Sequence, residues 1–156
     1  MRSRMLTERS EMDAIIARTE VCFVGMSGPD QKPYVLPFNF GYDGEFLYLH
    51  SDPAGKKMDI LAENPSVCIA FSTDHELFHR HEQVACSYGM RYRSVLIHGT
   101  VIFEDDSLEE KARILNIVME KYTGRSDFKY STPALKNVRT YKVLIEKIEG
   151  KESDYK

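Results

Sequence analysis

The apolar residues of the chain gather in six short segments that turn-forming residues separate. The segments are residues 21–26, 33–40, 45–50, 66–71, 93–103 and 140–148. Gly28-Pro29-Asp30 and Asp43-Gly44 lie between the first three segments, as is typical of hairpin turns. Short apolar segments with such boundaries predict β-strands. They indicate a mainly β (α+β) fold, a six-stranded antiparallel barrel with flanking helices.

Three other segments have the apolar spacing of amphipathic helices. They are residues 10–19, a segment that begins at Ser51-Asp52-Pro53 and ends at Asn64, and residues 107–124. Ser51-Asp52-Pro53 is expected to start the second helix, with a capping side chain and proline in the first turn. Ser107-Leu108-Glu109-Glu110 is a capping box for the third. The segment 73–90 is predicted to be irregular.

Four of the predicted strands are apolar on both faces of the pleat, for example VCFVGM (21–26) and SVCIAF (66–71). A strand with two apolar faces must also be covered on the outside of the barrel, either by helices or by a second copy of the chain. This pattern favours a homodimer.

Composition limits the classes of function. A chain of 156 residues fits one domain, 1–156. No apolar run approaches the ~20 residues of a membrane-spanning helix, and the net charge of -3 argues against a nucleic acid partner. The three cysteines form no C-x-x-C pair, and the first residues lack the pattern of a secretory signal. A cytoplasmic protein is expected.

The stretch HELFHRH (75–81) contains H-E-x-x-H, the pattern in which two histidines on one helix bind zinc. A zinc hydrolase would need a sustained helix here and a third ligand from elsewhere. The segment directly follows a predicted strand, so we interpret it as a histidine-rich loop near a cofactor cleft and predict no metal site. The zinc hydrolase remains a distant alternative.

The stretch YLHSDPAGKK (48–57) carries a clearer candidate site. A strand ends there, and a helix with two lysines in its first turn begins. The helix start would bring backbone N–H groups, the Ser51 hydroxyl and the Lys56 and Lys57 ammonium groups into one small volume. The segment is therefore a candidate phosphate site with His50 beside it, and a solvated basic first turn is the alternative.

The stretch YGMRYRSV (88–95) is a second candidate. Strand alternation would place Arg91, Arg93 and Val95 on one face and Tyr92 and Ser94 on the other. Arginine suits a bidentate contact with phosphate. The alternative is an edge strand with ordinary surface arginines. The other strand histidine, His98, is interpreted as structural.

These parts occur in a recognisable order. The run PYVLPFNFGYDGEFLYLHSDPAGKKMDILAENPSVCIAF, followed by CSYGMRYRSVLIHGTV and a helix, resembles the pyridoxamine phosphate oxidase-like split-barrel flavoproteins. Within that family it is most similar to the nitroimidazole-resistance reductase branch. The resemblance covers roughly residues 5–150.

The resemblance implies a homodimer of six-stranded split barrels that binds flavin mononucleotide (FMN) in two clefts at the subunit interface. It implies cofactor contacts from four parts of the chain: Pro37, Phe38 and Asn39 against the flavin ring; His50 and Ser51 at a strand end; Lys56 and Lys57 on the phosphate; and Tyr92, Arg93, Ser94 and Val95, often from the partner subunit.

The resemblance also limits the reaction. The chain ends in IEKIEGKESDYK, without the arginine and histidine signature of true pyridoxamine phosphate oxidases, so vitamin B6 oxidation is not expected. The resemblance implies an FMN-dependent oxidoreductase that takes electrons from NAD(P)H and reduces a small acceptor such as a nitroaromatic, with His50 as the catalytic residue. Some relatives hold flavin adenine dinucleotide (FAD) or haem instead. A flavin- or haem-binding module without turnover is the alternative.

Overall fold

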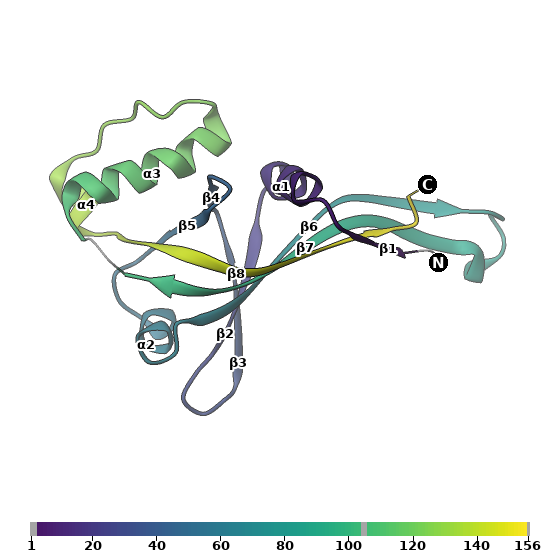
Figure 1. Cartoon of the computed structure of the whole chain (residues 1–156), viewed down its shortest axis with the longest axis horizontal. Helices are drawn as coiled ribbons and strands as arrows, with labels where there is room; N and C mark the ends of the chain where they lie inside the picture. The colour runs from purple at the N-terminus through teal and green to yellow at the C-terminus, as the bar shows by residue number, and fades with distance from the viewer. Residues whose placement is uncertain (1–2, 104–105, 156) are drawn as a thin grey trace.

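All six predicted strands are present, and two short strands join them. The computed structural model describes residues 3–103 and 106–155. Its strands are β1 (Ser3–Leu6), β2 (Cys22–Ser27), β3 (Pro33–Phe38), β4 (Gly41–Tyr42), β5 (Phe46–Ser51), β6 (Ser66–His79), β7 (Tyr88–Ile102) and β8 (Arg139–Ser153). The described strands form one sheet in the order β3-β2-β6-β7-β8-β5-β4, with β1 paired to β8. Every pairing is antiparallel. The sheet is curled into the expected split barrel (Figure 1).

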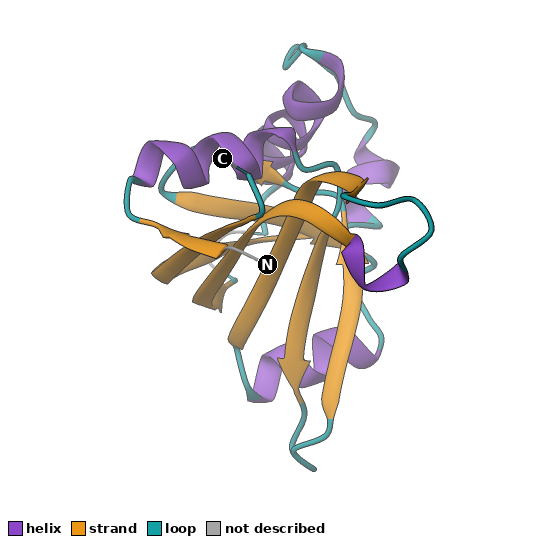
Figure 2. Ribbon diagram, turned by 90° about the vertical axis from the view of Figure 1, so that its right-hand side faces the viewer, coloured by secondary structure: helices purple, strands orange, loops and turns teal. Residues whose placement is uncertain are grey.

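Only residues 80–87 of the segment 73–90 lie outside the strands, so the prediction of an irregular segment was right in the middle and wrong at both ends. The segment contains the last part of β6 and the start of β7, which pair from Thr73↔Arg93 to His79↔Tyr88 across a register shift between Thr73 and Glu76. We call residues 73–93 the arm. It forms the right-hand end of the sheet in Figure 1, and it faces the viewer in Figure 2. The prediction failed at the ends because polar residues dominate this segment, although backbone pairing alone extends the hairpin.

The helices follow the amphipathic segments, with different start points. They are α1 (Arg9–Arg18), α2 (Lys56–Glu63), α3 (Leu108–Thr123), α4 (Thr132–Lys136) and a 3-10 turn, η1 (Ala85–Ser87). The capping box is confirmed, because the Ser107 side chain accepts a hydrogen bond from the Glu110 N–H at 3.2 Å. None of the helices in the described residues is long and apolar enough to cross a membrane.

Helix α2 starts later than predicted, and no side chain caps it. Ser51 belongs to β5, and the N-cap is Gly55, which has φ 114 and forms no side-chain cap. Positive φ is accessible to glycine at little cost, so the chain turns into the helix at this residue. The Ser51 hydroxyl donates instead to the Asp52 carbonyl at 3.0 Å.

The core fills the inside of the curled sheet. Its strand residues include Val24, Leu47, Leu49, Ile69, Phe71, Val95, Ile97 and Val143. Helix α1 adds Ile15 and Ile16, which are 1% and 0% exposed. Each of these two side chains contributes about 1.5–3 kcal/mol by leaving water. The packed interior leaves the two ends of the sheet, β3 and β4, at the opening of the split barrel.

Candidate functional site

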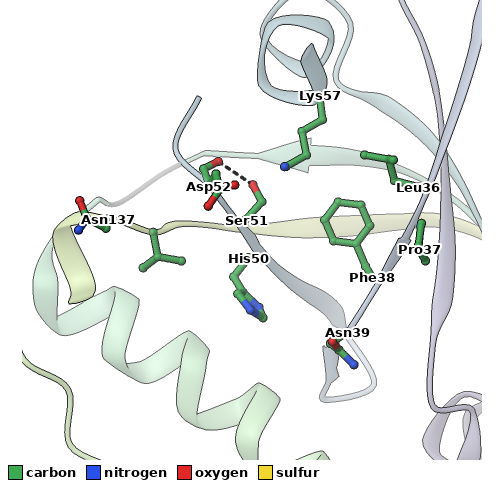
Figure 3. Close-up of a pocket in the computed structure, with 10 residues that line it drawn as sticks. Leu36, Pro37, Phe38, Asn39, His50, Ser51, Asp52, Lys57 and Asn137 are labelled. Atoms are coloured by element: carbon green, nitrogen blue, oxygen red, sulfur yellow. Dashed lines mark hydrogen bonds between the residues drawn. The ribbon is translucent and has the colours of Figure 1, made fainter. Parts of the chain in front are cut away.

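A cleft of about 500 Å³ lies where β3 and β5 approach each other at the opening of the barrel (Figure 3). Its lining residues are Leu36, Pro37, Phe38, Asn39, His50, Ser51, Asp52, Lys57, Asn137 and Val138. We call it the first cleft. The structure thus brings together six predicted cofactor contacts that lie far apart in sequence: Pro37, Phe38, Asn39, His50, Ser51 and Lys57.

Both strands that border the first cleft present backbone edges to it. Within the described chain β3 pairs with β2 alone. Strand β4 pairs with Leu47 and Tyr48 of β5, so its pairing ends before His50 and Ser51. Backbone N–H and C=O groups on such edges are available to a ligand. A flat heterocycle with hydrogen-bonding edges suits this geometry.

The His50 side chain is largely buried, and one of its ring nitrogens lacks a hydrogen-bond partner among the described residues. In register it lies opposite Thr140 of β8. Its Nδ1 atom is buried and has no hydrogen-bond partner among the described residues, and the same holds for Thr140 Oγ1. Burial lowers the pKa of His50 below its ordinary value, and burial raises the pKa of Tyr141 to about 12. All three groups are therefore neutral near pH 7.

An unpartnered buried polar atom costs about 1–3 kcal/mol. His50 Nδ1 and Thr140 Oγ1, on residues that lie opposite each other on β5 and β8, are two such atoms beside the cleft. A neutral imidazole has one N–H donor and one acceptor nitrogen. His50 can therefore give or take one hydrogen bond at a bound group, whereas a charged imidazolium is disfavoured.

The two neighbouring lysines diverge, which corrects the expectation that they share one small volume. Lys57 lines the first cleft and points towards the space beside Ser51 (Figure 3). Lys56 turns the other way, and its Nζ lies 4.6 Å from the centre of the Tyr34 ring. Successive residues on a helix differ by about 100° in direction, which separates the two ammonium groups. Among the described residues that line the first cleft, Lys57 is the one lysine or arginine.

The four predicted contacts on β7 do not reach this cleft within one chain. Arg93 lies opposite Glu152 on β8, whereas His50 lies opposite Thr140, so the two sites are separated by up to about 40 Å of strand. Arg93 Nε donates to Glu152 at 2.7 Å and its Nη1 to Asp74 at 2.9 Å. Its guanidinium also lies 3.8 Å from the centre of the Tyr155 ring.

The other three β7 residues have local roles. Val95 is 0% exposed and belongs to the core. Tyr92 pairs in register with Ser153 and lies near Lys151, whose Nζ is 5.7 Å from the Tyr92 ring centre. Ser94 pairs with Lys151. A contact between these residues and the first cleft would have to come from a second chain.

The HELFH segment is a strand, and not the helix that the zinc hydrolase hypothesis requires. His75 and His79 lie in β6, about 13 Å apart along an extended chain. His75 Nε2 is 2.8 Å from the Ser72 hydroxyl, and the His79 ring stacks on Tyr88 at 4.7 Å. No cluster of three metal-ligating side chains occurs in residues 3–103 and 106–155. The segment also lies at the far end of the sheet, and not beside the first cleft as expected (Figure 1).

Sequence reasoning missed part of the lining. Leu36 and Asp52 are neighbours in sequence of predicted residues. Whether their side chains point into the cleft depends on where the strands end, and the apolar pattern located those ends only approximately. Asn137 and Val138 come from the junction of α4 and β8, more than eighty residues from His50. No local motif marks such a contact. It follows from the β5–β8 pairing, in which Ser51 lies opposite Arg139.

Known proteins resemble the chain over almost its whole length. A family model described as pyridoxamine 5'-phosphate oxidase matches residues 8–152. A proposed 5-nitroimidazole antibiotic resistance protein from Bacteroides thetaiotaomicron is 40% identical, with a TM-score of 0.85 over 97% of this chain and 87% of that chain. No curated protein matches.

Two more distant crystal structures share the fold. An FAD-binding protein from Mesorhizobium loti is 24% identical, with a TM-score of 0.70 over 99% of this chain and 100% of that chain. An FAD and haem binding protein from Mycobacterium smegmatis is 20% identical, with a TM-score of 0.78 over 97% of this chain and 74% of that chain. The family match and the 40% identical relative confirm the resemblance found in the sequence. The chain belongs to the flavin-binding pyridoxamine 5'-phosphate oxidase-like split-barrel family.

Proposed function

We propose that the first cleft binds the flavin mononucleotide part of a flavin cofactor and that the protein is an oxidoreductase. The observation that carries this proposal is the meeting of three features in one cleft. These are two free strand edges, the ammonium group of Lys57 and the unpartnered Nδ1 atom of His50. A flavin has a flat ring with hydrogen-bonding edges and a phosphate group, so the residues present fit it.

Each part of the cleft has a distinct task in this proposal. Lys57 neutralises the phosphate at the start of α2, where helix N–H groups add to the attraction. The 36–39 segment of β3 holds the ring through its backbone and through Phe38, which is 8% exposed. His50 donates or accepts one hydrogen bond beside the ring and stays neutral because burial lowers its pKa. Bound flavin would supply the electron transfer that no protein side chain here provides.

The expected reaction is reduction of a small acceptor with electrons from NAD(P)H. The relative from Bacteroides thetaiotaomicron, a proposed 5-nitroimidazole antibiotic resistance protein, supports a nitroaromatic acceptor. The first cleft is open enough for a second small molecule to reach the ring, because Pro37 and Asn39 are exposed at its rim. His50 is the proposed catalytic residue, positioned to orient the acceptor by a hydrogen bond.

We further propose that the protein acts as a homodimer. The outer face of the sheet carries a row in register, Pro37–Phe23–Ala70–Leu96, in which Phe23 is 50% and Leu96 39% exposed. Apolar side chains in such a row favour burial against another surface. A second copy could also bring the β7 residues 92–95 to the first cleft. Replacing Phe23 and Leu96 together by lysine is expected to shift the sedimentation coefficient from dimer to monomer.

The absorption spectrum of the purified protein tests the proposed function. We expect a flavin band, or its appearance when flavin is added to flavin-free protein. Anaerobic mixing with NADH or NADPH should bleach that band, and a nitroaromatic should restore it. Absence of any flavin binding would refute the proposal, and bound flavin that never bleaches would support a binding module instead of an enzyme.

A further inference from the structure

A second cleft of about 320 Å³ lies on the other side of the α2 start. One wall is a single face of α2 that has helical spacing: Lys56, Asp59, Ile60 and Glu63. The opposite wall is formed by Pro29 in the turn between β2 and β3 and by Pro33 and Tyr34 at the start of β3. This turn is held by a hydrogen bond from the Gln31 N–H to the Gly28 carbonyl at 2.9 Å. The second cleft is therefore formed in advance of any ligand.

One face of β3 contributes side chains to both clefts. Tyr34, Leu36 and Phe38 alternate with exposed residues, so their side chains share a face of the strand. Tyr34 lines the second cleft, whereas Leu36 and Phe38 line the first. The start of α2 stands at the boundary, with Lys57 directed to one cleft and Lys56 to the other. An elongated ligand on this face would pass between two ammonium groups.

We propose that the second cleft binds the adenosine half of a dinucleotide, so that the protein takes FAD in preference to FMN. This inference rests on the proposed function, which puts the flavin half in the first cleft. A mononucleotide has one phosphate and needs one lysine. A dinucleotide has a pyrophosphate, and the divergent pair of Lys56 and Lys57 suits two adjacent phosphates at the junction.

The chemistry of the second cleft suits a neutral aromatic base with a sugar. The Lys56 ammonium lies 4.6 Å from the Tyr34 ring centre, so one face of this ring is turned towards the cleft. When Lys56 moves to a phosphate, that face becomes available for stacking, which is worth about 1–3 kcal/mol per base. Ile60, which is 5% exposed, adds an apolar floor.

The charged rim argues against a phosphate inside the second cleft. Three carboxylates, Asp30, Asp59 and Glu63, face two lysines, and Lys32 is already 3.6 Å from Asp30. Carboxylates accept hydrogen bonds from ribose hydroxyls and from an adenine amine, and they repel an additional phosphate. The occupant is therefore expected to end in unphosphorylated adenosine.

The experiment compares FMN and FAD titrations of flavin-free protein. Wild type is expected to bind FAD ~10-fold or more tightly than FMN, the ratio that one stacked base provides. Tyr34→Leu should remove this preference and leave FMN affinity unchanged, whereas Tyr34→Phe, which retains the ring, should keep it. Unchanged FMN affinity also shows that the variant is folded.

A second set of variants changes exposed residues, whose replacement does not disturb the packing of the core. Lys56→Ala and Asp59→Ala should each weaken FAD binding several-fold without changing FMN binding. Lys129→Ala, at an exposed lysine that lines neither cleft, is the matched control.

Three outcomes overturn the inference. Equal affinities for FMN and FAD in wild type would remove it, as would a Tyr34→Leu variant that keeps the preference for FAD. A Tyr34→Leu variant that raises only the KM for NADH would assign the second cleft to the nicotinamide dinucleotide instead. Failure of both flavins to bind is a different result, because it refutes the proposed function itself.

Discussion

The two ends of the long β8 strand differ in the kind of polar group that they hold: an ion-pair network surrounds Asp74 at the arm end, and neutral side chains are buried at the cleft end. At the arm end, Asp74 accepts hydrogen bonds from Arg18 at 2.6 Å and Arg93 at 2.9 Å, and Arg93 also donates to Glu152 at 2.7 Å. At the cleft end, the described residues offer no partner to His50 Nδ1 and the Thr140 hydroxyl, which are buried. Arg91 Nε and Ser153 Oγ are buried without a partner among the described residues at the arm end as well, but the ion pairs lie only a few residues away.

This difference separates a structural role from a binding role. Charged groups that satisfy one another hold the arm at the register shift beside Asp74, where φ is 57. Buried groups without partners destabilise the free protein, and a ligand that satisfies them recovers that energy. Polar residues alone do not mark a site, since the arm end is the richer of the two in ion pairs.

The sharpest test of the cleft end is the removal of its one lining ammonium group. Lys57→Ala is expected to weaken FMN binding ~10- to 100-fold, because a hydrogen bond to a charged group contributes about 1.5–3 kcal/mol. Fluorescence titration of flavin-free protein measures the change. Lys56→Ala is the matched control and should leave FMN affinity unaltered. Equal losses in both variants would mean that the lysines act through net charge and not through position.

At the arm end, Asp74→Asn should lower the free energy of unfolding by about 1–2 kcal/mol near pH 7, since its partners are partly exposed. The hydrogen bond from Arg18, above all, and that from Arg93 lower the pKa of Asp74 from 3.8 to about 2. This stabilisation is complete above pH 3.8 and is lost as the pH falls to about 2. Urea unfolding at several pH values checks this, and a change in FMN affinity would contradict the separation of the two ends.

His50→Leu exchanges the buried imidazole for an apolar side chain. The flavin-free protein is expected to become more stable by about 1 kcal/mol, while the rate of acceptor reduction falls. Because burial lowers the pKa of His50 below 6.5, unfolded wild type takes up a proton more readily as the pH falls below that value. The stability advantage of His50→Leu should therefore grow from pH 7 to pH 5. A variant less stable than wild type would show that His50 is already satisfied.

The smallest effect is expected at the arm histidines. Chelator treatment should leave flavin binding and acceptor reduction unchanged, and so should the substitutions His75→Ala and His79→Ala. The two histidines lie four residues apart on an extended strand, which keeps them too far from each other to bind one metal ion. Metal analysis of the purified protein is expected to find no stoichiometric zinc. Loss of activity on chelation would require a metal site built by more than one chain.

The sequence predicted the fold better than the direction of its side chains. Apolar periodicity located all six longer strands and the capping box of α3, because burial and capping are local signals. It missed β1 and β4, which are short and pair through backbone groups. It also missed the length of the arm, where polar residues hide the hairpin.

The candidate site was predicted in part for a similar physical reason. His50, Ser51 and Lys57 follow one strand–helix junction, so proximity in sequence was enough to group them. The separation of Lys56 from Lys57 depends on where α2 begins, and the turn at Gly55 places that start after the predicted one at Ser51-Asp52-Pro53. The contribution of Asn137 depends on which strands pair, and no short motif encodes that pairing.

Strand β3 has a consequence for self-association of the protein. An edge strand is a template on which another chain can add a strand and begin an aggregate. Pro33 and Pro37 lack the N–H groups that such an added strand would need, although Val35 between them is 57% exposed. The two prolines thus leave the edge open to a small molecule while they interrupt the ladder that fibril growth requires.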